Sequence, residues 1–126
     1  MKQLTKSYVY LSISGNNFDI EEFLSLFQFE PTRIGTHRIG YKFIEYKIEA
    51  ENIYEGLEEA MNKLKNIFFL KEESIKSYAI QNNLYIKVYV VIFKPKNKDS
   101  GAFLSNDIIK FLYNIGAEIE IDVYNR

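Results

Sequence analysis

The sequence predicts an α+β fold, a two-layer sandwich in which helices cover one face of a largely antiparallel sheet of about five strands. Stretches with alternating apolar residues, such as Val9, Leu11 and Ile13, show the period of a half-buried strand. Stretches with helical spacing separate them. Helices on one side of a sheet bury their apolar stripes against that side, so the other face stays open. The 126 residues fit a single α+β domain, residues 1–126.

The first strand is expected from Tyr8, with its apolar side alternating with a tyrosine side, and a turn at Gly15 should end it. A helix follows, for which Asp19 is the expected N-cap and Glu22, three positions later, completes a capping box. The apolar stripe of this helix consists of Ile20, Phe23, Leu24 and Phe27. Pro31 prevents the helix from continuing.

The middle of the chain should hold two strands and the longest helix. Residues 33–40 suit a short edge strand with a turn, and residues 41–49 alternate as a longer strand with Ile44, Tyr46 and Ile48 on one side. The helix is expected to begin near Asn52, with Glu55 completing a second capping box. Its stripe consists of Ile53, Leu57, Ala60, Met61, Leu64 and Phe68.

The last third should hold a short helix over 72–82, a central strand over 84–93, a helix from Ser105 to Gly116, and a final strand. The strand over 84–93 is apolar on both sides, which indicates a central position in the sheet. The final strand should place Ile119, Ile121 and Val123 inward and Glu118, Glu120 and Asp122 outward. This order of elements is related to the ferredoxin-like fold.

Composition excludes several classes of function. The formal net charge is −1, so no basic field exists to attract nucleic acid or an anionic membrane surface. Cysteine is absent, which excludes disulfides, thiolate metal sites and a cysteine nucleophile. With one histidine, His37, we expect no metal and no cofactor. No apolar run has the length of a membrane span, and we expect a soluble, cytoplasmic protein.

No catalytic set is apparent, so we expect the protein not to be an enzyme. A phosphate loop needs several glycines, but the first turn offers only Gly15, and acidic residues at Asp19, Glu21 and Glu22 would repel an anion. The carboxylates of Glu118, Glu120 and Asp122 would lie about 7 Å apart along one strand face. A catalytic acid and base need a cleft that raises one pKa, and an open strand face is wet.

Tyrosines supply the candidate binding residues. Tyr8, Tyr10, Tyr85 and Tyr89 all fall on the side of their strands that faces away from the helices, so they form an aromatic patch if the two strands are neighbours. Tyrosine suits protein interfaces, where its ring buries area and its hydroxyl stays bonded. It also suits a half-exposed sheet for purely structural reasons. Arg33 and Arg38, with Lys42 nearby, are further candidates for contact with an anionic group or an acidic partner.

Two segments carry a resemblance, SISGNNFDIEEFLSLFQFEPT near the start and GAFLSNDIIKFLYNIGAEIEIDVY at the end. Together they resemble the bacterial family known as domain of unknown function 4279. The likeness implies the same fold and no particular chemistry, and it suggests an immunity protein that neutralises a toxin. We therefore expect a non-catalytic domain that binds another protein. The alternative is a small-ligand-binding or regulatory domain with an aromatic pocket between helices and sheet.

Overall fold

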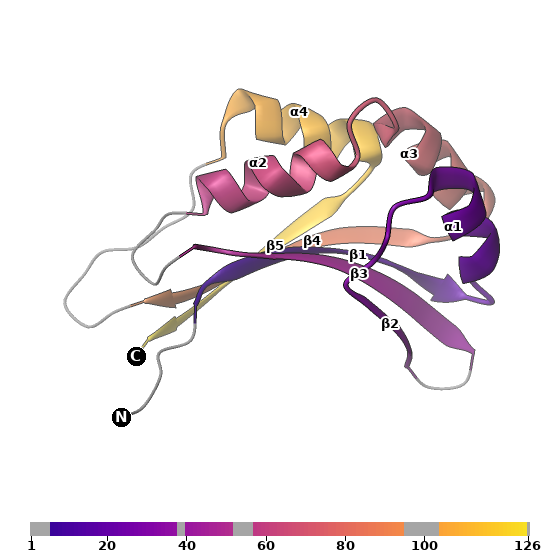
Figure 1. Ribbon diagram of the computed structural model, residues 1–126, viewed down its shortest axis with the longest axis horizontal. Helices are drawn as coiled ribbons and strands as arrows, with labels where there is room; N and C mark the ends of the chain where they lie inside the picture. Colours follow the sequence, from indigo (N-terminus) through magenta and orange to yellow (C-terminus); the bar gives the residue numbers. More distant parts are fainter. Residues whose placement is uncertain (1–5, 38–39, 52–56, 95–103, 126) are drawn as a thin grey trace.

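A computed structural model describes residues 6–37, 40–51, 57–94 and 104–125. The elements follow in the order β1 (Tyr8–Asn16), α1 (Ile20–Phe27), β2 (Arg33–Thr36), β3 (Tyr41–Glu49), α2 (Glu58–Ile67), α3 (Glu72–Gln81), β4 (Tyr85–Lys94), α4 (Asn106–Ile115) and β5 (Glu118–Asn125). The strands form one sheet in the order β2-β3-β1-β4-β5, with only the β4–β5 pair parallel. The helices lie together on one face of that sheet (Figure 1). The predicted two-layer α+β sandwich is confirmed.

The elements from β1 to β4 follow the β-α-β-β-α-β order of the ferredoxin-like fold, with α2 and α3 in the place of its second helix. Their strands make a fully antiparallel sheet in the order β2-β3-β1-β4. A further helix and strand, α4 and β5, extend the sheet beyond β4. β5 can run parallel to β4 because α4 carries the chain back to the end of the sheet at which β4 begins.

The core fills the space between the two layers. Its sheet side consists of aliphatic residues at alternate positions of β1, β3 and β4, and its helix side consists of the apolar stripes of the helices. Phe68, at the end of α2, packs edge-on against Tyr46 with ring centroids 5.0 Å apart. The Tyr46 hydroxyl donates a hydrogen bond to the Phe29 carbonyl oxygen at 2.8 Å, which satisfies the buried phenol.

Three helix ends are capped by the residues that the sequence predicts. The Ser105 hydroxyl accepts a hydrogen bond from the Ile108 amide, and Gly116 ends α4 with a φ of 75°. Asp19 Oδ1 accepts from the Glu22 amide at 3.0 Å. The Glu22 carboxylate accepts from the Tyr78 hydroxyl at 2.7 Å, which ties α1 to α3.

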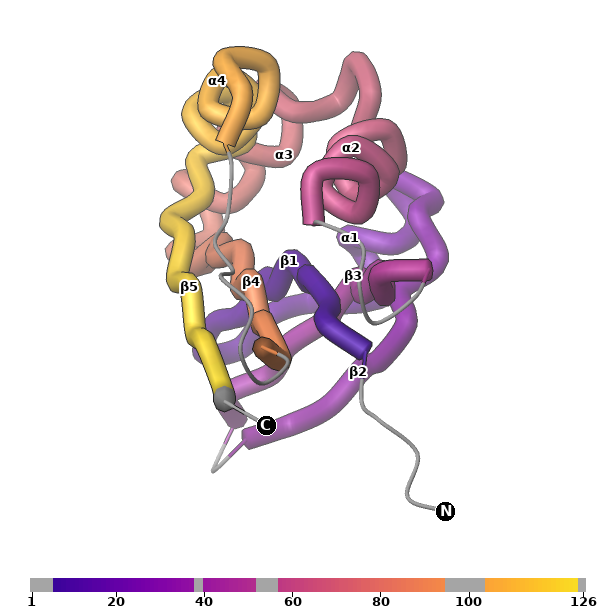
Figure 2. Tube along the Cα trace, turned by 90° about the vertical axis from the view of Figure 1, so that its left-hand side faces the viewer, coloured from indigo at the N-terminus to yellow at the C-terminus, as the bar shows by residue number. Residues whose placement is uncertain are grey.

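Three details differ from the sequence interpretation. Gly15 lies inside β1, and the turn that follows is formed by Asn17 with a φ of 59°. α2 begins at Glu58, while the expected cap region at 52–56 lies outside the described residues. Ile121 and Val123 are on the helix side of β5, yet they are 43% and 49% exposed, because this edge strand extends past α4 (Figure 2).

Candidate functional site

The face of the sheet turned away from the helices, termed the open face, carries the candidate site. Tyr8 and Tyr10 of β1 and Tyr85 and Tyr89 of β4 all lie on it, as the alternation predicts. β1 and β4 are neighbours, and Tyr10 lies directly opposite Tyr89 in their register. Each ring is only partly buried, and Tyr85 is 42% exposed. The four tyrosines therefore sit on adjacent inner strands of a face that the described helices leave uncovered.

Three of these tyrosines stack in a line that crosses the strands. The rings of Tyr10 and Tyr89 are 4.5 Å apart and inclined by 14°, and Tyr8 stacks on Tyr10 at 6.0 Å. The line continues from Tyr8 to Phe93 at 6.3 Å and from Phe93 to Tyr124 of β5 at 5.4 Å. Such ring pairs add to the energy of burial and hold each other in place.

Two lysines contact the outer rings of this stack. Lys47 Nζ lies 4.2 Å from the centroid of Tyr8, and Lys87 Nζ lies 4.9 Å from that of Tyr89, both within the range of a cation–π contact. Burial, followed by the neighbouring Tyr89, raises the pKa of the Tyr10 phenol to about 12. The Tyr10 phenol is thus neutral at physiological pH, and both lysines and the carboxylates of Glu45 and Glu120 lie around the stack.

Arg33 lies beside two of the tyrosines in the lining of a pocket of about 390 Å³. It is lined by Tyr8, Tyr10, Thr32, Arg33, Glu45 and Lys47. The Arg33 guanidinium makes a loose ion pair with Glu45 at 3.8 Å and remains largely exposed. Lys42 projects to the opposite face of β3, so it does not join Arg33, and Arg38 lies outside the described residues.

Phe43 and Gly35 belong to the same face and were missed in the sequence. The Phe43 ring is 2% exposed although the described helices do not cover it, because it lies between Arg33, at 5.1 Å, and the ring of His37, at 4.3 Å. Gly35 is opposite Phe43, and a Cβ at Gly35 would lie 2.4 Å from the ring. A glycine facing an aromatic residue across paired strands is the signal that could have identified this contact.

Two of the three carboxylates of β5, Glu118 and Glu120, are hydrogen-bonded from β4 and are not simply solvated. The Tyr85 hydroxyl donates to Glu118, and Lys87 Nζ donates to Glu120 at 2.9 Å. The hydrogen bond from Lys87 lowers the pKa of Glu120, while burial and then the hydrogen bond to Glu120 raise the pKa of Asp122. Glu120 is held by a cation on an open strand face, which does not provide the cleft that a catalytic acid and base need.

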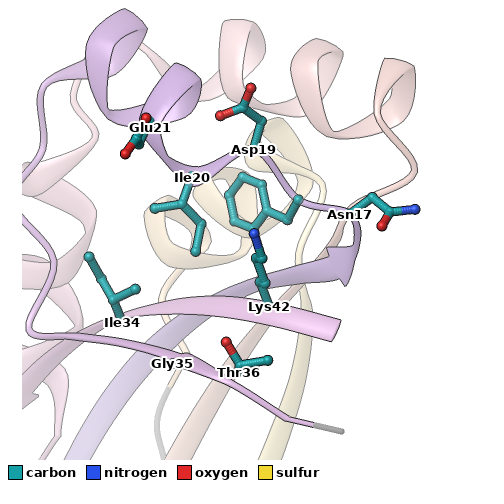
Figure 3. A pocket seen from close by; sticks show the side chains of 9 residues that line it. Asn17, Asp19, Ile20, Glu21, Ile34, Gly35, Thr36 and Lys42 are labelled. Atoms are coloured by element: carbon teal, nitrogen blue, oxygen red, sulfur yellow. The ribbon is translucent and has the colours of Figure 1, made fainter. Parts of the chain in front are cut away.

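A second pocket, of about 730 Å³, lies between the beginning of α1 and the edge strand β2. Ile20 and Ile34 point toward one another across it, and Lys42 rises from β3 toward the start of α1 (Figure 3). Asp19 and Glu21 stand on the helix side of the pocket. Its lining therefore combines an apolar part with one cation and two carboxylates.

In the described part of the chain, no three histidine, aspartate or glutamate side chains are grouped so that they could hold a metal ion. None of the described helices has the length and apolar character to cross a bilayer.

Comparison with known proteins identifies the family. The model of the family described as domain of unknown function (DUF4279) matches residues 5–126. The chain belongs to this family. The resemblance found in the two terminal segments is thereby confirmed. No curated protein and no solved structure matches this DUF4279 chain.

Proposed function

We propose that this DUF4279 chain is a non-catalytic protein-binding domain that contacts its partner through the open face of the sheet. The proposal rests on the stack of Tyr8, Tyr10 and Tyr89 beside the Arg33 pocket, on a face that the described helices leave uncovered. Tyrosine and arginine are enriched among the residues that dominate binding energy in protein interfaces. A tyrosine ring buries a large area while its hydroxyl keeps a polar partner.

The packing of the stack suits it to binding. Tyr10 is held between the rings of Tyr8 and Tyr89, and each of these two outer rings also contacts a lysine, so little side-chain freedom remains to be lost when a partner docks. Below the rings lies the sheet, with Val91 and Phe43 already buried on this face. A preorganised aromatic surface with a charged margin has the arrangement of an interface core and its rim.

Within this class we propose the role of a bacterial immunity protein that neutralises a toxin in the cytoplasm. Such a protein acts by tight contact and needs no catalytic group. The hydrogen-bonded carboxylates of β5 and the aromatic centre of the open face are both compatible with that requirement.

Site-specific photocrosslinking in cells tests the proposed surface. A photoreactive benzoylphenylalanine replaces Tyr89 on the open face or, as the control, Tyr113 on α4, which is 75% exposed. We expect a defined protein to be crosslinked from position 89 and not from position 113. Co-expression with the captured protein should then relieve its toxicity if the partner is a toxin. Crosslinking from position 113 alone would place the interface on the helix layer and contradict the proposal.

The pocket between α1 and β2 favours a second candidate, a small-ligand-binding or regulatory domain. It lies between a helix and the sheet and includes the aromatic Phe18 in its lining. A ligand that binds only the folded protein raises the melting temperature, so a metabolite screen tests this alternative. Ile34→Trp, which would fill the pocket from the exposed edge strand, should abolish any such shift. A shift that survives this change would place the ligand elsewhere.

A further inference from the structure

The outer edge of β5 offers an unpaired row of backbone groups. Among the described strands only β4 pairs with β5, over the full length from Glu118 to Asn125. Alternate residues of a strand direct their N–H and C=O groups to opposite sides, so half of those on β5 point away from β4. The other edge strand, β2, has four residues, whereas β5 has eight. β5 is thus the longer hydrogen-bonding edge.

The two faces of β5 differ sharply in chemistry. Glu118, Glu120 and Asp122 occupy the open-face side. Ile119, Ile121 and Val123 occupy the helix side, and the last two are 43% and 49% exposed where β5 extends away from α4 (Figure 2). An extended segment added beside β5 would meet carboxylates on one face of the sheet and exposed aliphatic side chains on the other. The segment that fits has basic and apolar residues in alternation.

Hydrogen-bond donors on β4 pair with only two of the three carboxylates in this row. Tyr85 and Lys87 donate to Glu118 and Glu120. Asp122 lies opposite Val91, which cannot pair with it, and its nearest polar partner is the like-charged Glu120, with a weaker attraction from Lys87. A lysine or arginine on a strand added at the free edge would lie beside Asp122 and provide a direct opposite charge.

A second copy of the chain does not fit this edge. If β5 paired with β5 of another copy in antiparallel fashion, both acidic rows would lie on the same face of the continuous sheet. Like charges directly opposite one another destabilise a strand pair. The same row that favours a basic segment therefore opposes self-association, which is how natural sheets protect exposed edges.

We propose that the free edge of β5 binds an extended segment of a partner protein, with its basic residues beside Glu118, Glu120 and Asp122 and its apolar residues over Ile121 and Val123. Main-chain hydrogen bonds supply affinity in such strand addition, and the alternating side chains supply specificity. The free edge of β5 faces away from β4 and the tyrosine stack, although Lys87 contacts both Tyr89 and Glu120, so binding at this edge is tested separately from the function proposed above.

Peptide binding to the full chain tests this inference. The probe is a fluorescent eight-residue peptide that alternates lysine and valine, and binding is followed by anisotropy. A peptide with four lysines followed by four valines has the same charge and composition but the wrong alternation. We expect the alternating peptide to bind more tightly than this control, and amide exchange to slow at alternate residues of β5. Equal binding of the two peptides would show that only net charge matters and would overturn the proposal.

Charge reversal at Asp122 tests whether the peptide binds beside β5. Asp122→Lys should weaken binding of the alternating peptide about three- to tenfold, since it replaces an attractive cross-strand pair by a repulsive one. Glu59→Lys, an exposed change on α2, is the matched control and should have no effect. The proposal is wrong if Asp122→Lys leaves peptide binding unchanged. It is also wrong if the wild type binds no peptide while Asp122→Lys dimerises, because the acidic row then serves only to prevent self-association at this edge.

Discussion

At the scale of single residues, the contact between Gly35 and Phe43 shapes one end of the open face. The Phe43 ring lies so close over Gly35 that a Cβ there would come within 2.4 Å of a ring atom. Arg33 and His37 pack on the same ring. Only glycine at position 35 leaves the ring in this position.

Gly35→Ala should therefore destabilise the fold, by about 1–3 kcal/mol, because the added methyl must displace a buried aromatic ring. Urea unfolding measures this loss. Thr36→Ala, one position along the same strand and exposed, serves as the control and should change stability by no more than about 0.5 kcal/mol. Equal midpoints for the two variants would mean that the ring moves freely aside.

The Tyr10 phenol should make stability sensitive to alkali. Its pKa in the folded protein is about 12, raised first by burial and then by Tyr89, whereas an unfolded tyrosine titrates near pH 10. A folded-state pKa above the unfolded one confers stability that is present below pH 10 and is lost as the pH rises toward 12. Tyr10→Phe keeps the ring and removes this titration. Unfolding measured between pH 9 and 12 should show a steeper loss for the wild type, and parallel curves would contradict the burial of this phenol.

At the scale of elements, local signals identified α4 well and the turn after β1 poorly. Ser105 and Gly116 act as cap and stop through contacts within a few residues, so the sequence displays them directly. Gly15 looked like a turn residue, but it lies within β1, where a Cβ would come within 2.7 Å of the Leu84 side chain. That contact joins positions far apart in the chain, and no local pattern reveals it.

Ser105→Ala should lower the free energy of unfolding by about 1 kcal/mol, because the amide of Ile108 loses its hydrogen-bond acceptor at the N-terminus of α4. Ser25→Ala, an exposed change within α1, is the control and should be neutral or slightly stabilising, since alanine favours a helix. Chemical denaturation of both variants gives the comparison. A larger effect at Ser25 than at Ser105 would show that the cap is energetically unimportant.

At the scale of the whole molecule, periodicity predicted the layers and the face on which each tyrosine lies, because strand alternation alone assigns residues to faces. Periodicity could not predict which strands pair. The meeting of Arg33 with Tyr8 and Tyr10 depends on β2 lying beside β3 and β3 beside β1, and the hydrogen bonds to Glu118 and Glu120 depend on the β4–β5 register. The candidate site is assembled by this long-range pairing, so the sequence showed its parts separately.

The most direct test of the open face as a binding surface is a titration of the captured partner protein against the chain carrying both Tyr10→Ala and Tyr89→Ala. These rings stack at the centre of the sheet, and central interface tyrosines typically contribute about 2 kcal/mol or more each, so affinity should fall roughly 1000-fold. Tyr113→Ala on α4 should bind as the wild type does. Melting curves should show the double variant still folded and less destabilised than Leu112→Ala, which opens a cavity in the core. Unchanged affinity in a folded double variant would contradict the account.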